Sequence, residues 1–512
     1  MHIFYFYVHF FFKNLHTSYS CVTFAPEIYV KPKVKRMKKL LISTFTMCLS
    51  ASVMAGGLNT NSNQNASFER QMSQNGIIDI AGMYANPAGT AFLANGWHFQ
   101  LTSMSVWQQR NITTTFPLFP YNAARPGETT HEYKGTAKAP VIPSFSVSYN
   151  RDKWSANFHF GVTGGGGKCD FPNGLGSFES LVGGTIVSAV GLPNFRGYSL
   201  DSKMEGHSYV FGAQIGGTYK ILPNLSAFAG VRLVYGNNGY DGYIHNITAL
   251  IPNPMDPSSN VPVTADQDPR LSSIDLDCTQ KGWGVTPIIG LDWKATDYLN
   301  LAVKYEIPTK MVYKNTSTLS IAANAVSSLA KFRDGYKVRE DLPGILSMGA
   351  MATPIKSLRM MIGWNVYFDS AVKKGVKDND GNDIVAAYKA GEYRPVDGNP
   401  DILARDIDAN TWEMNMGVEY DICKYLTVSG SWQRTTYGIS DTGMSDLSFN
   451  NTNNMFGFGV RVKPIEHLSF DLGFMHTIYQ DRSVITPTAV GNKNDLYIRR
   501  NDVLGVGVIY EF

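Results

Sequence analysis

The sequence predicts an all-β fold: a 14-stranded antiparallel transmembrane β-barrel with an N-terminal hatch, or plug, inside the lumen. Three observations predict it. The composition is low in charge and rich in glycine and aromatic residues, segments of alternating polarity recur along most of the chain, and the last of them ends on the C-terminal phenylalanine. Together they favour a barrel whose outer face lies in lipid.

The composition excludes several classes of protein. Of the 512 residues, 44% are hydrophobic and only 17% are charged, whereas an ordinary globular chain carries roughly 25% charged residues. With 48 glycines and 12% aromatic residues, the chain is too apolar and aromatic to be disordered. No run of about 20 apolar residues, as a membrane-spanning helix requires, follows residue 56. A net charge of +3 gives no indication of nucleic-acid binding.

Residues 37–55 have the three parts of a secretory signal peptide. Two lysines supply the positive charge, a short apolar run follows, and Val53 and Ala55 place small residues before a cleavage site at Gly56. Because a signal peptide normally begins within the first few residues, we expect residues 1–36 to be an upstream extension or a mis-assigned start.

Residues 97–512 repeat one pattern: an alternating strand, a short turn, another alternating strand and a long polar loop. Along residues 299–307, for example, leucine, valine, tyrosine and isoleucine occupy one face, and asparagine, lysine and glutamate occupy the other. The segments have about 10 to 14 residues, the length of a tilted membrane-spanning strand. We predict strands at residues 97–110, 141–151, 154–163, 207–220, 225–240, 281–294, 299–312, 343–353, 358–370, 410–421, 426–438, 452–463, 468–480 and 500–512.

The order of turns and loops predicts which end of the barrel faces which side. Short turns follow the even-numbered strands, as on the periplasmic side of outer-membrane barrels, and long loops follow the odd-numbered strands. Aromatic residues gather near the strand ends, as interfacial girdles require. A terminal residue such as Phe512 is typical of bacterial outer-membrane barrels, so we expect an outer-membrane location and recognition of Phe512 by the barrel-assembly machinery, with outer-membrane lipid around a monomer.

Residues 56–96 do not alternate and form the predicted hatch. Their apolar side chains, among them Phe68, Ile80 and Tyr84, need burial. A fourteen-stranded barrel has a lumen wider than its own side chains can fill. We therefore expect this segment to fold into the lumen of the barrel at residues 97–512.

Two stretches of this segment carry a family resemblance. Asn-Ala-Ser-Phe at residues 65–68, and residues 81–89 with Asn86, Pro87 and Ala88, lie between the signal peptide and the first strand. In both, the chain resembles the FadL/TodX family of outer-membrane transporters of long-chain fatty acids and other hydrophobic compounds. The resemblance implies a fourteen-stranded barrel, a hatch gate at Asn86, Pro87 and Ala88, a kinked third strand that opens toward the bilayer, and no TonB-type energy coupling.

The predicted third strand has a break that fits this resemblance. It contains Gly161 and is followed by the glycine run at residues 164–167 in a predicted surface loop. Glycine weakens strand pairing and marks bulges or close approaches. Gly161 and Gly164 are therefore candidates for a lateral exit, and the alternative is an ordinary flexible entry into the loop.

The loop after this strand is unusually apolar for an extracellular loop. At helical spacing its apolar residues would present a hydrophobic surface for substrate capture, as the family's use of this loop implies. The alternative is a helix that packs over the barrel mouth. The residues proposed for capture are Phe178, Leu181, Val182, Ile186, Val190 and Phe195.

Nothing in the sequence indicates catalysis, a cofactor or a metal. The histidines lack ligand spacing, and no CxxC motif occurs. Cys169 and Cys278 fall in predicted polar loops, where they either pair or remain free thiols. The inward-facing charged residues are interpreted as a network of charge pairs that holds the barrel and the hatch together: Arg232, Lys304, Glu306, Arg359, Asp369, Glu413, Glu419, Arg461 and Asp471.

The function predicted is passive transport of hydrophobic molecules, such as long-chain fatty acids, by diffusion through a hatch-gated barrel with a lateral exit. The partner is a hydrophobic small molecule. Two alternatives remain: a non-transporting surface protein that binds a partner through the long loops at residues 241–280 and 371–409, and a general porin. Fold and family do not fix the ligand.

Overall fold

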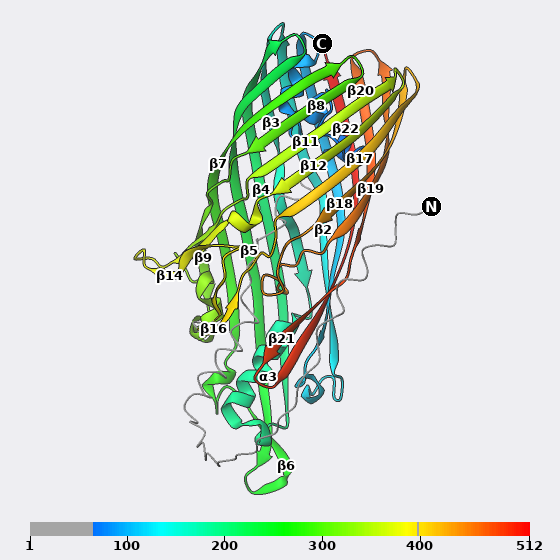
Figure 1. The fold of residues 1–512 in the computed structure, drawn as a ribbon. Helices are drawn as coiled ribbons and strands as arrows, with labels where there is room; N and C mark the ends of the chain where they lie inside the picture. Colours follow the sequence, from blue (N-terminus) through cyan, green and yellow to red (C-terminus); the bar gives the residue numbers. More distant parts are fainter. Residues whose placement is uncertain (1–64, 397–398) are drawn as a thin grey trace, which may run out of the picture. The chain divides into compact units, whose positions relative to one another are not determined.

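The computed structural model describes residues 65–396 and 399–512. The predicted signal peptide, the upstream extension and the first part of the hatch segment lie outside the described residues. The main sheet is a closed antiparallel barrel of fourteen strands, because β1 (Gly96–Thr115) pairs with β22 (Gly491–Glu511) as well as with β2 (Thr130–Arg151) (Figure 1). The predicted fold class is confirmed.

Every predicted strand is present in the barrel. Four of the fourteen barrel strands each consist of two consecutive segments. The remaining barrel strands are β3 (Trp154–Phe171), β4 (Gly197–Leu222), β5 (Leu225–Asn253), β7 (Ile274–Thr296), β8 (Leu299–Glu306) with β9 (Val312–Leu319), β11 (Ile345–Ile355) with β10 (Lys337–Glu340), β12 (Leu358–Tyr367) with β13 (Lys373–Lys377), β17 (Thr411–Cys423), β18 (Leu426–Thr436), β19 (Asn453–Ile465) and β20 (Leu468–Tyr479) with β21 (Arg482–Thr488).

The predicted short turns are confirmed, but several of the predicted long polar loops are partly strand, and the two longest show this most clearly. In residues 241–280, β5 and β7 stay paired beyond the predicted strand ends, and β6 (Asp256–Val263) adds a hairpin. Residues 371–409 contain β13, β14 (Asp383–Lys389), β15 (Arg394–Val396) and β16 (Asn399–Ala404). An antiparallel ladder satisfies its own backbone groups in water as well as in lipid, so pairing continues where the apolar alternation stops.

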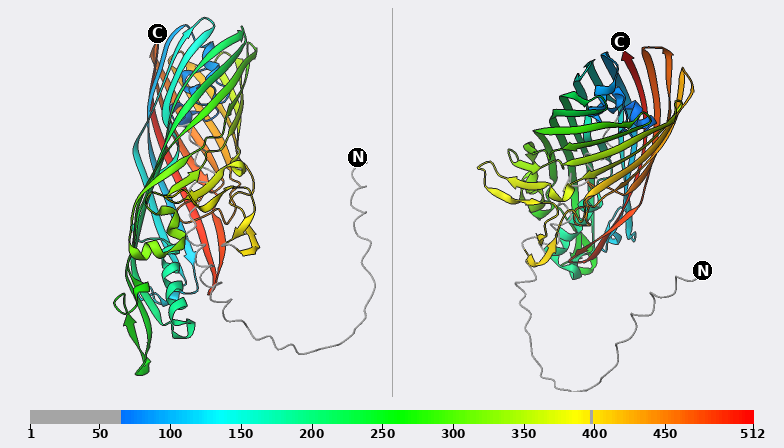
Figure 2. Two further views of the ribbon diagram at one scale, coloured as in Figure 1. Left: turned by 90° about the vertical axis from the view of Figure 1, so that its left-hand side faces the viewer. Right: turned by 45° about the horizontal axis from the view of Figure 1, so that its top comes forward.

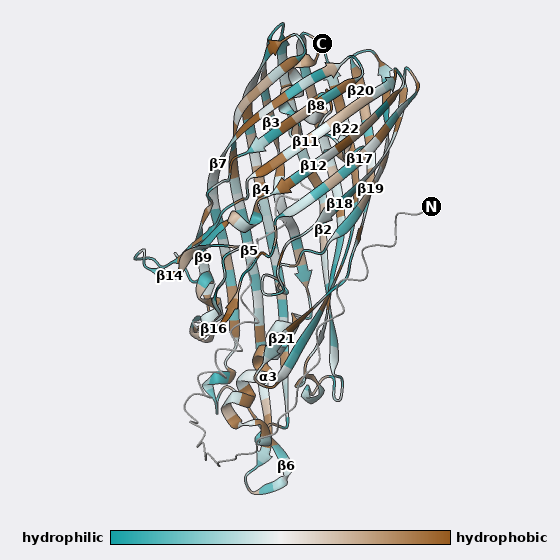
Figure 3. Cartoon of the chain, viewed as in Figure 1, coloured by the Kyte–Doolittle hydropathy of each residue, from teal (hydrophilic) through white to brown (hydrophobic). Residues whose placement is uncertain are grey.

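Side chains alternate between an apolar outer face and a polar lumen. On β7, Leu291 and Trp293 are exposed whereas Asp292 between them is fully buried. Figure 3 shows the same alternation of hydrophobic and hydrophilic residues along the barrel strands. An exposed apolar face of this extent matches lipid rather than water. Within the described part of the chain, no helix has the length and apolar character to cross a membrane.

The N-terminal described segment lies inside the barrel. It contains α2 (Ala66–Arg70) and the 3-10 helices η2 (Ile80–Met83) and η3 (Pro87–Phe92). Figure 2 shows these helices enclosed by the strands at the end that carries the C-terminus. We call residues 65–95 the plug.

The opposite end of the barrel carries the longer connections. Figure 1 shows α3 (Gly176–Val190) there. The other helices of the described chain are η4 (Phe119–Tyr121), η5 (Leu192–Asn194), η6 (Pro269–Leu271), α4 (Ile321–Ala325), η7 (Ser327–Phe332) and η8 (Asp369–Ala371). The largest cluster of buried apolar side chains also lies at this end and includes Phe178, Phe195, Phe332 and Phe449.

Candidate functional site

Glycines in the barrel wall make room for the plug helix α2. A Cβ at Gly473 would lie 2.5 Å from the backbone nitrogen of Arg70, and one at Gly505 would lie 2.8 Å from Cα of Ala66. Asn65 caps the helix by accepting a hydrogen bond from the Phe68 N–H at 2.8 Å. The helix therefore packs directly on the wall backbone, which larger wall residues would prevent.

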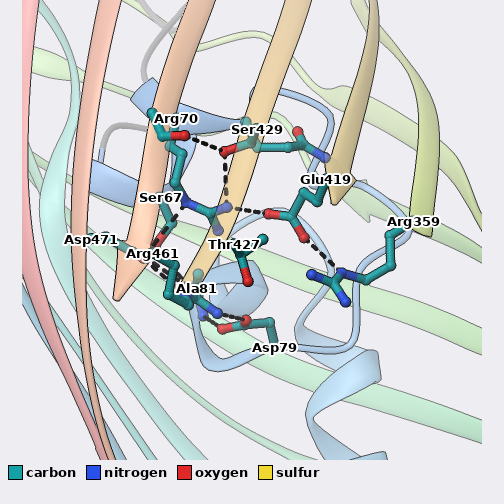
Figure 4. Close-up of polar contacts among 12 residues, drawn as sticks. Ser67, Arg70, Asp79, Ala81, Arg359, Glu419, Thr427, Ser429, Arg461 and Asp471 are labelled. Atoms are coloured by element: carbon teal, nitrogen blue, oxygen red, sulfur yellow. Dashed lines mark hydrogen bonds and ion pairs between the residues drawn. The ribbon is translucent and has the colours of Figure 1, made fainter. Parts of the chain in front are cut away.

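A network of ion pairs fixes the plug to the wall (Figure 4). Arg70 of α2 contacts Glu419 at 2.5 Å. Arg461 of β19 contacts plug residue Asp79 at 2.6 Å and wall residue Asp471 at 2.7 Å. Arg359 extends the network by pairing with Glu419 at 2.9 Å. Because plug and wall each supply both signs of charge, this end of the lumen is polar and the plug is bound to the wall by ion pairs on several strands.

A second group of charges surrounds Tyr84 of the plug. Arg232 and Lys304 lie over its ring, with Cζ and Nζ at 4.4 and 4.7 Å from the ring centroid. Both cations pair with Glu306 at 2.6 Å. The predicted charge pairs are therefore present at seven of the nine residues, while Asp369 and Glu413 accept hydrogen bonds from the Thr411 N–H and the Tyr367 hydroxyl.

The Asn-Pro-Ala element fastens the plug to β5 and β7. The amide of Asn86 donates hydrogen bonds to Asp292 of β7 and to the Ile77 carbonyl. Pro87 begins η3, and the Ala88 carbonyl accepts a hydrogen bond from Ser226 at 2.7 Å. In this state the three residues predicted as the gate are an attachment point between plug and wall.

The wall has a gap between β2 and β3. The two strands pair at Ala137–Cys169 and again at Phe145–Phe160, and no pairing joins them between these points within the described residues. β2 carries Pro140 and Pro143 here, which lack an N–H for the ladder. We call residues 138–144 of β2 and 161–168 of β3 the wall gap.

The predicted exit residues Gly161 and Gly164 lie in the wall gap. The glycine run at residues 164–167 is inside β3 and not in a surface loop, so that expectation is wrong. β3 pairs with β4 on its other side through two register shifts in this run, and Gly165 and Gly167 have φ of 109° and 70°. Only glycine adopts such angles freely, and the ladder between β3 and β2 is interrupted along the same residues.

A cavity of about 370 Å³ joins the lumen to the wall gap. Its lining includes both sides of the gap together with lumen-facing residues of β1, β19, β20 and β22. Apolar groups form much of the wall, and two arginines and several tyrosines are also present: Val106, Arg110, Ile142, Tyr437, Met455, Met475, Tyr479, Arg499 and Val503. The volume lies in the range of small-molecule pockets.

The predicted capture residues lie on α3 and just after it, but the structure does not expose them as a hydrophobic surface. Five are buried, and Val190 is half-buried against the same apolar cluster. The arrangement matches the alternative in which the helix packs over the barrel mouth. The five buried residues are Phe178, Leu181, Val182, Ile186 and Phe195.

Glu179 anchors α3 from within this apolar cluster. Its carboxylate accepts hydrogen bonds from Asn122 and Tyr133 at 2.5 Å and from Tyr198 at 2.8 Å, and contacts His131 Nδ1 at 3.0 Å. Burial acts to raise the pKa of Glu179, but the hydrogen bonds from His131, Tyr133 and Asn122 outweigh it and hold the pKa below its ordinary value. Sequence reasoning missed this group because its members are spread over residues 122–198.

The three cysteines of the described residues form no disulfide. Cys169 and Cys278 lie buried and free on β3 and β7 rather than in polar loops, and Cys423 is exposed and free at the end of β17. The described residues contain no group of acidic, histidine or cysteine side chains arranged to hold a metal.

The chain has a closed fourteen-stranded barrel with an internal plug, and this is the fold of the FadL- and TodX-type outer-membrane proteins. It superimposes on a Pseudomonas aeruginosa FadL homologue with a TM-score of 0.62 and 14% identity over 89% of this chain and 100% of that one. It superimposes on the Pseudomonas putida toluene transporter TodX with a TM-score of 0.54 and 13% identity, over 88% of this chain and 99% of that one. No family model and no curated protein matches the sequence.

Proposed function

We propose that the protein is a passive channel of the bacterial outer membrane that admits hydrophobic molecules from outside and releases them sideways into the bilayer through the wall gap. One observation carries the proposal: the 370 Å³ cavity leads to the gap in the wall, whereas the way along the barrel axis meets the plug and its ion pairs.

The physical chemistry of the two routes differs. Passage along the axis would bring an apolar solute among Arg70, Arg461 and Asp471, where it would displace hydrogen bonds and ion pairs without replacing them. Exit through the gap transfers the solute from a partly apolar cavity into hydrocarbon, and apolar transfer from water releases about 25 cal/mol per Å². The sideways route needs no energy source.

The structural neighbours support a hydrophobic substrate. One is a FadL homologue and another is a toluene transporter. In the proposed scheme, α3 and its apolar residues from Phe178 to Phe195 form the entrance and capture solutes when the helix shifts. The element Asn86, Pro87 and Ala88 gates the lumen at the end of the barrel that carries the C-terminus.

Narrowing the wall gap tests the scheme. A Cβ at Gly161 would lie 3.4 Å from Cβ of Ser144 on the far side of the gap, so Gly161→Leu places a branched side chain between the strands. We expect uptake of labelled toluene and oleate into cells to fall at least about tenfold, a change that corresponds to about 1.4 kcal/mol. Gly430→Ala on β18, where the added Cβ meets only ordinary contacts of 3.7 Å or more, is the control and should leave uptake unchanged.

Conductance separates the alternatives. A plugged barrel gives little steady current in a planar bilayer, and deletion of residues 65–95 should open it. A steady large conductance of the intact protein would favour a porin. Unchanged uptake in both the Gly161→Leu and the plug-deletion variants would refute the lateral-exit scheme and favour the surface protein that binds a partner through its loops.

A further inference from the structure

An apolar groove of about 930 Å³ crosses the lipid-facing wall of the barrel, away from the wall gap. It lies over the consecutive neighbours β5, β7, β8, β11, β12 and β17, and none of its described lining residues belongs to β1, β2 or β3. Leu291 and Trp293 of β7 and Trp364 of β12 line it from the exposed apolar face. Asn224, at the turn between β4 and β5, is the only described lining residue with an amide, hydroxyl or charged side chain.

The floor of the groove is made by small residues. Ala350 of β11 is the direct cross-strand partner of Leu301 on one side and of Ile362 on the other, so a methyl group lies between two large side chains. In the adjacent row, a Cβ on Gly349 would point into the lumen, 2.5 Å from Cβ of Asn75 in the plug. The wall is therefore one backbone thick here, with the groove on its outer side and the plug on its inner side.

The groove spans the depth of one membrane leaflet. It begins at Leu222 and Leu225, beside the short turn between β4 and β5, and reaches Met414 of β17. Met414 lies about seven residues before the turn that follows β17, which at about 3.3 Å per residue and a strand tilt of about 40° is about 18 Å along the membrane normal. Half of a hydrocarbon core of about 30 Å is about 15 Å. The groove therefore runs from the rim of the barrel at the short turns to about the middle of the bilayer.

The length and lining of the groove suit an acyl chain. Five strand spacings separate β5 from β17, and at about 4.8 Å each they make a path of about 24 Å. An extended acyl chain of a membrane phospholipid has a similar length and presents only hydrocarbon to the lining. An extended protein segment would bring backbone N–H and C=O groups, which cannot remain unpaired in lipid. The contacts of a chain held in a fixed groove are van der Waals contacts, each small but many in number.

The residues that form the groove also contact the plug from the other side. Nδ2 of Asn75 donates hydrogen bonds to the Met348 carbonyl at 3.1 Å and to the Asn365 side chain at 3.0 Å. A Cβ on Gly76 would lie 2.8 Å from the backbone nitrogen of Ala350, so the plug backbone rests directly on β11. Met348 and Ala350 thus contribute side chains to the groove and backbone atoms to the plug contact. A displacement of β11 changes both.

We propose that this groove holds an acyl chain of a phospholipid from the leaflet beside the short turns, and that the chain stabilises the contact of β11 with Asn75 and Gly76 of the plug. The bound lipid is a resident part of the wall and not a transported molecule, so the inference goes beyond the proposed function and does not depend on it. The groove and the cavity at the wall gap share no described lining residue.

Native mass spectrometry of the purified full chain tests the binding. Dioleoylphosphatidylethanolamine is added to delipidated protein in detergent, and we expect a single lipid to remain bound under conditions that remove the others. Ala350→Phe places a ring in the groove, so the affinity for this lipid should fall at least about tenfold through the loss of many van der Waals contacts. Trp293→Ala opens one side of the groove on β7, two strands away from Ala350, and should also weaken binding.

Ala156→Phe is the matched control, because Ala156 is an exposed alanine of β3 outside the groove. It should bind the lipid like the unaltered protein. Heat-dependent mobility on gels confirms that each variant is a folded barrel. Absence of a retained lipid on the unaltered protein overturns the proposal, as does equal retention in Ala350→Phe and Ala156→Phe. A dimer that Ala350→Phe abolishes would also overturn it, because the groove would then hold a second copy of the chain.

Hydrogen exchange measures the effect of the lipid on the plug. In the unaltered protein and in Ala156→Phe, the lipid should slow exchange of the amides of residues 72–78 at least about twofold, since local opening of the plug becomes rarer. Ala350→Phe should show no such slowing. Retention of the lipid without any change in this exchange overturns the stabilising role. Gly161→Leu should keep both the bound lipid and the slowing, so a failure of the lateral-exit scheme and a failure of this inference are separate results.

Discussion

At the scale of single residues, two buried carboxyl groups predict opposite effects of pH on the stability of the folded chain. Glu179 is buried with hydrogen-bond donors around it, whereas both side-chain oxygens of Glu69 are buried without a partner. The first is held as an anion and the second as a neutral acid. A fall in pH is therefore expected to destabilise the packing of α3 and to stabilise the packing of the plug.

Glu179 predicts that α3 loosens in acid. Because its pKa in the folded chain lies below the ordinary value, its contribution to stability is present above the ordinary glutamate pKa and is lost as the pH falls through the folded value. Limited proteolysis in the α3 region should therefore accelerate below about pH 4. Glu179→Gln should show faster cleavage already at neutral pH, with a loss of about 2 kcal/mol.

Glu128→Gln provides the control for this prediction, because Glu128 is exposed near the same end of the barrel. Its cleavage should follow that of the unaltered protein at every pH. Equal protection of α3 in Glu179→Gln and in the unaltered protein would contradict the anchoring role.

Glu69 predicts the opposite dependence for the plug. Burial raises the pKa of Glu69 to about 8. The folded state therefore keeps a proton that the unfolded chain releases above its ordinary pKa, and stability falls as the pH rises from that value toward 8. Thermal unfolding followed between about pH 5 and 9 should show this loss, and Glu69→Gln should reduce it. An identical pH profile in the two proteins would contradict the prediction.

At the scale of elements, the plug depends on ion pairs that the barrel strands complete. Asp471→Asn removes a charge that contacts Arg461 at 2.7 Å and Arg70 at 3.5 Å. Arg70 keeps its contact with Glu419 and Arg461 keeps its contact with Asp79, but both lose the buried carboxylate that they share, and the loss of a hydrogen bond between charged groups costs about 2 kcal/mol. We expect a lower unfolding temperature and frequent opening events in single-channel recordings.

An exposed ion pair supplies the comparison for the plug. Asp441 pairs with Arg482 at 2.7 Å, but 62% of its side chain is accessible. Such pairs contribute about 1 kcal/mol or less, so Asp441→Asn should unfold and conduct like the unaltered protein. Equal effects of the two substitutions would show that the plug does not depend on the buried network.

The elements also show how far sequence patterns reach. Alternation and the short turns predicted the barrel strands, because lipid on one side and water or plug on the other impose a period of two. Where lipid does not contact the outer face, a strand need not alternate between apolar and polar residues. The paired extensions of β5 and β7 lack this alternation and were therefore predicted as loops. The wall gap was only half predicted: the glycines of β3 were noted, while Pro140 and Pro143 of β2, an equally readable signal, were not.

At the scale of the whole barrel, the orientation follows from the connections at its two ends and can be tested with single cysteines. Cys423 is exposed at the end of β17, beside a short turn that we assign to the periplasmic side. Met255, between β5 and β6, is 96% exposed at the other end. A large membrane-impermeant maleimide should label Met255→Cys in intact cells and Cys423 only after the outer membrane is permeabilised. Labelling of Cys423 in intact cells would reverse the orientation.

The sequence by itself determined the fold class, the fourteen strands and their short turns, and the existence of an apolar segment that requires burial inside the barrel. These are local properties, since period and turn chemistry act over a few residues. The tertiary structure decided what the sites consist of. Arg110 meets Arg499, Glu179 meets Tyr198 and Asn86 meets Asp292 because barrel closure and strand register bring distant residues together, and neither closure nor register is encoded within a single segment.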